Sequence, residues 1–129
     1  MPSQTPEKIS QTIKHVVDLC PDQIQTMYMH YKPDTRSYMV RMVQDGPLPD
    51  FYDRKALFVE ATNQLMDAGY ARAGFESFAR PNDILADAIE NNKATYNSLG
   101  TVTAEALNFV AVGSSAHGAH GDDYFFQNY

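Results

Sequence analysis

The segment between Asp50 and Gly69 sets the clearest limit on the fold, because it has the pattern of a capped amphipathic helix. Four apolar side chains fall on one face of that helix: Leu57, Phe58, Ala61 and Leu65. Asp50 can cap the first turn, and Gly69 stands where a left-handed C-terminal cap is favoured. A helix of this kind has to bury its apolar face, so we predict a packed core.

A second amphipathic helix is predicted near the N-terminus, with Thr5 as its cap and Pro6 in its first turn. Its apolar stripe consists of Ile9, Ile13, Val16 and Val17. The helix should end near Leu19, because Pro21 disfavours helical backbone at the residue before it.

Segments with strand character alternate with these helices. The predicted strands are Gln23–Tyr31, Tyr70–Glu76 and the apolar run Ala106–Val112. In the first of them, the side chains on the two faces alternate with the two-residue period of a strand. A long connection covers Lys32–Pro49, with at most one helical turn; a turn follows at Phe78–Pro81, and a short helix at Asn82–Asn91. This alternation is typical of a parallel α/β sheet. The polar residues of the first strand indicate that one of its faces lines a polar cavity or an interface.

Length, charge and cysteine content narrow the classes of protein. The 129 residues suffice for about one domain, which we place at 1–129. The formal net charge of −6 repels phosphate backbones and anionic membranes, so neither nucleic acid nor a membrane is a predicted partner. No signal peptide or spanning segment is recognised, and a single cysteine, Cys20, excludes an internal disulfide. A cytoplasmic protein is expected.

Candidate site residues lie where the predicted strands end, since active sites in barrel-like α/β folds occupy the carboxyl ends of strands. They fall in three clusters: Met27 with Met29 and His30; Glu76 with Phe78 and Arg80; and Gly113 to His117, which includes Ser115 and Ala116. Backbone N–H groups of the glycine-serine turn can approach a ligand closely.

Each cluster also has a structural interpretation. The methionines can fill the core, and His30 can be a hydrogen-bonded structural histidine. Arg80 can bind a carboxylate or phosphate, or anchor its loop by pairing with Asp83 or Asp87. His117 and His120 lack a flanking carboxylate pattern, so no metal site is predicted. These residues do not by themselves specify a reaction.

Several short motifs occur together in one order along the chain. They are Met1–Glu7, Pro21-Asp22, Asp67–Tyr70, Phe78–Asp83, Gly113–Ala116, and Tyr124 shortly before Gln127-Asn128. In order and spacing they resemble the HemN-like oxygen-independent coproporphyrinogen III oxidases, which are radical S-adenosylmethionine (radical SAM) enzymes. The resemblance spans almost the whole chain.

This resemblance implies the C-terminal portion of a radical SAM domain, a partial parallel (β/α) barrel segment with about three strands and flanking helices. Enzymes of this family cleave S-adenosylmethionine reductively on a 4Fe-4S cluster, and the resulting radical abstracts hydrogen from a tetrapyrrole propionate. By resemblance, cofactor binding is assigned to Met27, Met29, His30, Gly113, Ser115, Ala116 and His117. Substrate binding is assigned to Glu76, Phe78, Arg80 and Leu99. No catalytic residue is assigned.

The sequence also departs from the family. Leu99 replaces a ligand-holding glutamine, Met27 and Met29 replace aromatic residues, and the three cluster cysteines have no counterpart. We therefore expect the chain alone to be inactive and to need the missing half-barrel or an oligomeric partner. Alternatives are a HemN-like methyltransferase or haem-utilisation enzyme, and a non-catalytic haem-binding or haem-delivery protein with His30, His117 or Met29 as axial ligands.

Overall fold

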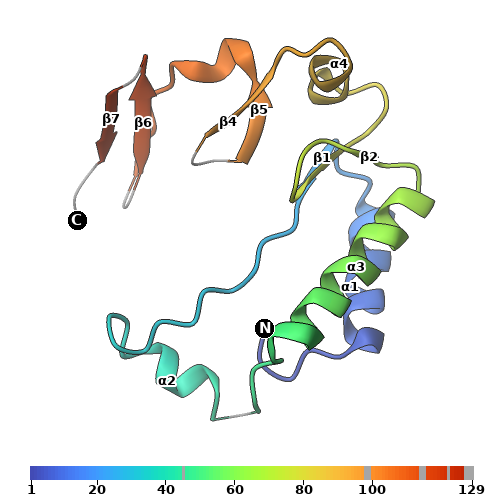
Figure 1. Cartoon of the computed structure of the whole chain (residues 1–129), viewed down its shortest axis with the longest axis vertical. Helices are drawn as coiled ribbons and strands as arrows, with labels where there is room; N and C mark the ends of the chain where they lie inside the picture. Colours follow the sequence, from blue (N-terminus) through green and yellow to red (C-terminus); the bar gives the residue numbers. More distant parts are fainter. Residues whose placement is uncertain (45, 98–99, 114–115, 122, 127–129) are drawn as a thin grey trace.

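Two long helices lie side by side in the computed structural model, which describes residues 1–44, 46–97, 100–113, 116–121 and 123–126 (Figure 1). Helix α1 covers Pro6–Leu19 and helix α3 covers Phe51–Asp67. The Thr5 side chain accepts a hydrogen bond from the Lys8 amide at 3.3 Å, and Asp50 accepts one from the Asp53 amide at 2.8 Å. Both helices predicted from the sequence are confirmed, together with their caps.

The ends of these helices follow from backbone chemistry. Cys20 takes a left-handed conformation (φ 52°) after α1, and Gly69 (φ 91°) follows α3. The connection from 32 to 49 contains one helical turn, α2 (Met39–Met42), as the sequence predicts. The predicted short helix after Asn82 is α4 (Ile84–Glu90), with Asp83 as its cap.

The prediction of parallel strands is wrong for the described residues, because every described strand pair is antiparallel. A three-stranded sheet has the order β1 (Gln23–Gln25), β3 (Ser77–Ala79), β2 (Ala71–Arg72). Two hairpins follow: β4 (Ala94–Asn97) with β5 (Gly100–Thr103), and β6 (His117–His120) with β7 (Asp123–Phe126). Parallel neighbours need a crossover of a dozen or more residues, which the short connections of the β2–β3, β4–β5 and β6–β7 hairpins do not provide. β1 also pairs antiparallel with β3, although a long connection through α3 joins them. The fold is mixed α/β with no parallel barrel segment in the described part.

Three predicted strand assignments change accordingly. The first strand stops at Gln25, and residues 26–31 continue as extended chain outside the sheet. The predicted strand Tyr70–Glu76 is half of a hairpin, and the predicted turn Phe78–Pro81 overlaps the central strand β3. The apolar run Ala106–Val112 begins in a 3₁₀ turn (Ala104–Leu107) instead of a strand. Gly74 (φ 121°) permits the β2–β3 turn, where a Cβ would collide with the Thr101 side chain.

The core lies on both faces of the small sheet. One cluster joins α1, α3 and the sheet through Ile13, Ala61, Leu65, Tyr70 and Phe78. A second, under α4, contains Ala73, Ala79, Leu85 and Ala86. The sheet is therefore a layer between helices, which explains why all three residues of β3 are buried.

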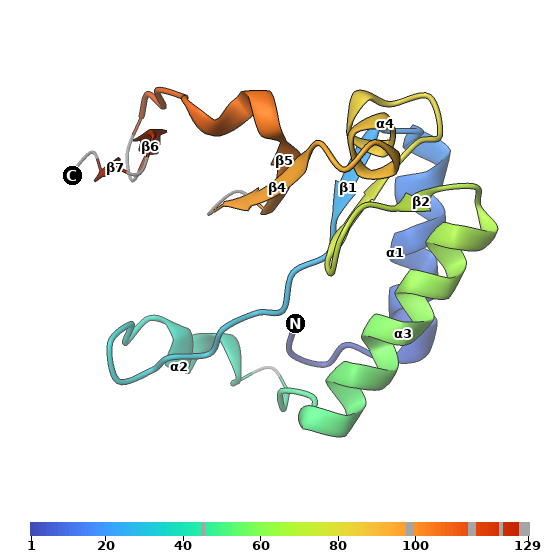
Figure 2. The ribbon, with the colours of Figure 1, turned by 45° about the horizontal axis from the view of Figure 1, so that its top comes forward.

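The rest of the chain is open and exposes much apolar surface. The β4–β5 and β6–β7 hairpins extend away from the paired helices in both views (Figures 1 and 2). The accessible surface is 9160 Å², against about 6,900 Å² for a compact protein of 14.5 kDa. Leu19, Val110 and Val112 are more than three-quarters exposed, at 81%, 80% and 91%. Among the described residues, no helix combines the length and apolar character needed to cross a membrane.

Candidate functional site

A groove lies between the extended segment 26–32 and the exposed side of α3. It has a volume of about 910 Å³ and is called the α3 groove below. Its described walls come from segment 28–32, Leu48 and Pro49, the exposed side of α3, and Arg72 and Phe75 around the β2–β3 turn. Phe51, Phe58 and Val59 supply much of the apolar surface along α3. The groove is large enough for a sizeable organic molecule.

Three aromatic rings follow one another along this groove. The ring centroids of Tyr28 and Phe58 lie 5.4 Å apart, with 34° between the planes. Those of Phe58 and Phe75 are also 5.4 Å apart, stacked at 18°. Phe75 is 62% exposed, so its ring extends the apolar wall toward solvent. The wall suits the flat face of an aromatic ligand.

Cationic side chains surround the same wall. Lys32, Arg54, Lys55 and Arg72 line the groove, and no Asp or Glu occurs among its described lining residues. Arg72 is oriented by carbonyl groups: its Nε donates to Gly74 O at 3.0 Å and its Nη2 to Phe75 O at 3.2 Å. Arg54 Nε donates to Asp50 O at 3.2 Å. Because these acceptors are neutral carbonyl groups, they do not compensate the positive charges of Arg54 and Arg72. The groove therefore favours anions.

The positive charge of Arg54 also acts on the N-terminal amino group. Burial, and then the nearby Arg54 guanidinium, lower the pKa of the Met1 amino group below its ordinary value. Arg54 also lines a second groove of about 560 Å³, between segment 26–29, α1 and α3.

The predicted residues Met27, Met29 and His30 lie on the extended segment that separates the two grooves. Met29 and His30 line the α3 groove, while Met27 and Met29 line the second groove. Met27 is 65% exposed, so core filling does not account for it. The structure therefore places Met29 with His30 in one groove and Met29 with Met27 in the other.

Glu76 and Phe78 occupy different environments. Glu76 Oε1 accepts hydrogen bonds from Gln25 Nε2 at 3.2 Å and from Tyr96 OH at 3.4 Å. The polar residue Gln25 of the first strand thus has a polar partner, and Gln23 has one in Asp83 at 2.8 Å. Phe78 is fully buried in the core, so its side chain offers no surface to a ligand in this structure.

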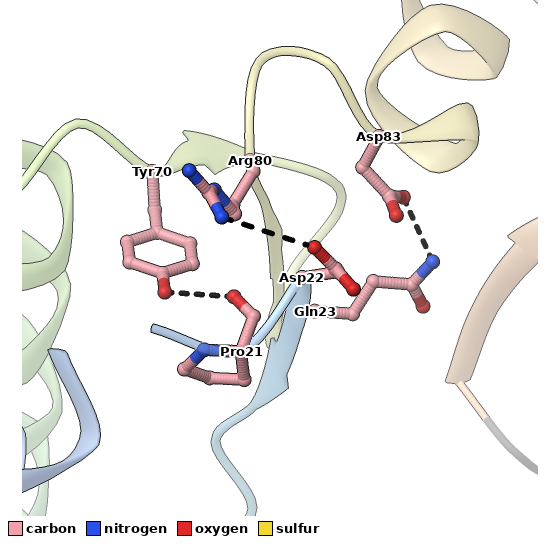
Figure 3. A network of polar contacts seen from close by, with 6 residues as sticks. All are labelled: Pro21, Asp22, Gln23, Tyr70, Arg80 and Asp83. Carbon is pink, nitrogen blue, oxygen red and sulfur yellow. Dashed lines mark hydrogen bonds and ion pairs between the residues drawn. The ribbon is translucent and has the colours of Figure 1, made fainter. Parts of the chain in front are cut away.

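Arg80 belongs to a polar network that ties the start of β1 to the end of β3 (Figure 3). Its Nη1 lies 4.0 Å from Asp22 Oδ1, instead of pairing with Asp83 or Asp87 as the structural interpretation expected. The Arg80 amide also donates to the Asp22 carbonyl at 2.9 Å. Both side chains of the ion pair are substantially exposed, which limits its contribution to stability.

Tyr70 is the buried member of this network. Its hydroxyl donates to the Pro21 carbonyl at 2.8 Å. Burial, followed by the nearby Cys20 and Asp22, raises the pKa of the Tyr70 phenol, and Arg80 opposes the shift. Protonated Tyr70 therefore stabilises the fold below the ordinary tyrosine pKa of about 10, and this contribution is lost as the pH rises through the raised value.

We predict that Tyr70→Phe lowers the free energy of unfolding by about 1 kcal/mol at neutral pH, because the Pro21 carbonyl loses its donor. Urea unfolding followed by circular dichroism measures the change. The variant should also lose less stability than the parent above pH about 10. Tyr52→Phe, at a side chain that is 77% exposed, is the matched control. Equal losses of unfolding free energy for Tyr70→Phe and Tyr52→Phe would contradict the stabilising role of the Tyr70–Pro21 hydrogen bond.

The third predicted cluster lies apart from the other two. The Ala116 amide donates to Gly113 O at 3.1 Å, and Gly113 has a positive φ of 127°. His117 begins β6, and its ring meets Phe109 edge to face at 6.4 Å. His117 does not line either of the grooves that contain Met29. Ser115 and Leu99 lie outside the described residues, so their predicted roles stay predictions.

The described part of the chain contains no group of three or more His, Cys, Asp or Glu residues placed to hold a metal ion. Cys20, the single cysteine, is exposed at the C-terminal end of α1.

Sequence reasoning missed the residues that give the α3 groove its character. Lys32, Arg54, Lys55 and Arg72 show no periodicity and form no motif, and Phe75 looks like an ordinary strand residue. Only the fold brings them to one groove. A weak signal was available in Arg54-Lys55, which stands close to Phe58 and Val59 in the same helix.

Comparison with known proteins identifies close relatives of this segment, although no family model matches the chain. The oxygen-independent coproporphyrinogen III oxidase of Salmonella typhimurium is 32% identical over 124 residues, covering 96% of this chain and 27% of that protein. The enzyme of Bradyrhizobium diazoefficiens is 31% identical over 128 residues, covering 99% and 28%. The chain therefore spans little more than a quarter of the length of these curated relatives.

A solved structure agrees with this result. It is that of coproporphyrinogen III oxidase (HemN) from Escherichia coli, which is described as a radical SAM enzyme. The match has a TM-score of 0.80 and 30% sequence identity, and it covers 99% of this chain and 29% of the Escherichia coli chain. The resemblance expected from the sequence motifs is confirmed.

Proposed function

We propose that this chain forms part of a radical SAM oxidoreductase acting on a tetrapyrrole-like substrate. The reason is that the chain is homologous along its full length to part of the HemN oxygen-independent coproporphyrinogen III oxidases. The observation that carries the proposal is the match over 96% of the chain at 32% identity. The rest of the catalytic domain, in this proposal, comes from elsewhere.

The residues present do not fit the iron–sulfur cluster of such an enzyme. A 4Fe-4S cluster takes three or four thiolates, and this chain has one cysteine. Cys20 is exposed at the end of a helix, away from any cluster of metal-ligating side chains in the described residues. In the proposed enzyme the thiolates therefore belong to another part of the domain, and no redox step is assigned to this chain.

The residues of segment 26–30 fit a role in binding the organic part of the cofactor. Thioethers pack well on aromatic faces, so Met27 and Met29 would contact a flat group such as adenine. His30, at the edge of the α3 groove, would hold a polar group by a hydrogen bond. When bound, S-adenosylmethionine supplies the radical that abstracts hydrogen, and these side chains would orient it and exclude water.

The alternatives expected from the sequence have less support. The relatives and the solved structure described above all bear the name of the oxidase, which favours an oxidoreductase over a methyltransferase. Haem delivery would need axial ligands on one surface. Within the described residues, His30 and His117 do not line a common groove, whereas Met29 and His30 both line the α3 groove, so the haem alternative rests on that pair.

A chimera tests the proposal. In the Escherichia coli oxidase, the homologous segment is replaced by this chain, and formation of 5′-deoxyadenosine from S-adenosylmethionine is measured without oxygen. We expect the chimera to exceed the deletion variant by at least about tenfold, and Met29→Ala with His30→Ala to lower that yield about tenfold. Lys14→Gln, on the exposed side of α1, should have no effect. A chimera that binds its cluster but cleaves no more cofactor than the deletion variant would refute the proposal.

A further inference from the structure

We infer that the segment 29–44 is a hinged strap beside the α3 groove, held open by like charges and able to close when those charges are screened. It is called the strap below. The inference concerns the motion of this chain and goes beyond the proposed function. Three observations support it: how the strap is attached, where its two ends lie, and which charges it carries.

The strap is attached to the rest of the chain near its two ends. Before it, the amide and the hydroxyl of Thr26 both donate to Glu76 O, at 2.8 and 3.1 Å. After it, the Ser3 amide donates to Pro47 O at 3.0 Å. These bonds fix one end of the strap to the sheet and the other to the segment that precedes α1.

The strap is held in shape by its own contacts. Met39 is buried, at 6% exposed, and the Lys32 amide donates to its sulfur atom at 3.3 Å. The other residues of 29–44 are exposed or half-buried. Their hydrogen bonds stay within the strap, apart from one that the adjacent Gly46 amide donates to Val43 O at 3.4 Å. The strap can therefore move as one small body without breaking a hydrogen bond of the helix–sheet core.

The two ends of the strap lie along the α3 groove. Residues 29–32 begin the strap and line the groove, and so do Leu48 and Pro49, which follow it. Much of the facing wall is α3. The helical turn α2, in the middle of the strap, stands apart from α3 in both views (Figures 1 and 2). A rotation of the strap about its two attached ends therefore widens or narrows the groove.

The strap carries a surplus of positive charge. Its cations are Lys32, Arg36 and Arg41, and its one carboxylate is Asp34. All four of these residues are exposed. None of the three cations has a carboxylate partner in the part of the chain that the structure describes. The strap is thus basic, although the chain as a whole has a net charge of −6.

The wall that the strap approaches is basic too. Arg54 and Lys55 line the groove from α3. The carboxylates at the start of this helix, Asp50 and Asp53, do not line it. Repulsion between the two sets of cations favours the open position at low ionic strength, because the Debye length is about 30 Å at 0.01 M salt. At 1 M salt it is about 3 Å, and the repulsion is largely screened.

Exposed apolar side chains supply the force for closing. On the strap, Tyr38 and Val40 are 59% and 47% exposed. On α3, Phe51 and Val59 line the groove and are 66% and 47% exposed. Closing brings the first pair toward the second and removes apolar surface from water. Because this burial opposes the charge repulsion, screening the charges shifts the population toward the closed position.

Distances between two spin labels test the strap. The labels are attached to Ser37→Cys, next to α2, and to Met66→Cys, in the last turn of α3, in a chain that also carries Cys20→Ser. Double electron–electron resonance is recorded at about 0.01 M and about 1 M NaCl. The labelled chain is diluted with unlabelled chain, so that distances between molecules do not contribute. We expect the distance to shorten by more than about 2 Å at high salt. A control pair on the two packed helices, Gln11→Cys with Met66→Cys, should not change.

Removing the charges should have the same effect as screening them. In the labelled chain, Lys32→Gln with Arg41→Gln should shorten the Ser37–Met66 distance already at low salt and leave little further response to salt. Lys14→Gln with Lys93→Gln removes the same number of charges from exposed positions outside the strap, and the salt response should be kept. Far-UV circular dichroism verifies that each variant is folded.

Two results would overturn the inference. One is a Ser37–Met66 distance that does not change with salt. The other is an equal salt response in the parent and in the variant that lacks Lys32 and Arg41, because the charges of the strap would then not hold it open. Neither result affects the cleavage of S-adenosylmethionine by the chimera, so the strap and the proposed function are tested separately.

Discussion

Phe78→Ala is expected to remove a large part of the stability of the helix–sheet core. Phe78 is fully buried on the central strand, where it contacts the cluster that joins α1, α3 and the sheet. Truncating a buried phenylalanine costs about 3–5 kcal/mol, because the transfer free energy is lost and a cavity remains. Small domains have a total stability of about 5–15 kcal/mol. Urea unfolding at low chain concentration should show a midpoint lower by roughly 2 M, or no transition.

A matched control comes from the same residue type. Phe51 begins α3 and is 66% exposed, so Phe51→Ala should change the free energy of unfolding by no more than about 0.5 kcal/mol. Similar losses for Phe78→Ala and Phe51→Ala would show that the two-sided core does not hold this fold together.

The isolated chain is expected to associate with itself and to bind hydrophobic dyes. Its surface exceeds that of a compact protein of this mass by roughly 2,300 Å². That excess is comparable with one face of a large, permanent interface. Part of it is apolar: Val110, Val112, Phe75 and Tyr96 are all at least 62% exposed. β1 and β2 are the edge strands of the described three-stranded sheet and add strand edges to this surface.

Sedimentation velocity at several chain concentrations measures this association. We expect species larger than a monomer whose proportion grows with concentration, with strong binding of anilinonaphthalene sulfonate. A chain that sediments as a monomer at every concentration and binds little dye would contradict the expectation, because it would show that the exposed surface requires no partner.

The helices were predictable from the sequence because their determinants are local. Thr5, Asp50 and Gly69 mark helix ends through contacts within one turn, and the apolar stripes repeat within single segments. The pairing direction of the strands was not predictable in this way. Residues 70–79 have the composition of a strand followed by a turn, and only the tight bend at Gly74 makes them two antiparallel strands.

The site was predictable only in part, for a related reason. Met27, Met29 and His30 were found because they follow a strand-like pattern in one segment, although residues 26–31 are extended chain outside the sheet, with 26–29 along one groove and 28–31 along the other. The cations and Phe75 of the α3 groove come from distant segments. Their proximity depends on how the extended segment crosses α3, which no local pattern encodes.

Mixing the chain with the Escherichia coli oxidase that lacks the homologous segment tests the central claim most directly. If the proposed function is right, sedimentation should show a complex of one copy of each, with dye binding and self-association both suppressed. Albumin, added at the same concentration, should not have this effect. Failure of the two parts to associate, while the chain stays a stable monomer, would contradict the account.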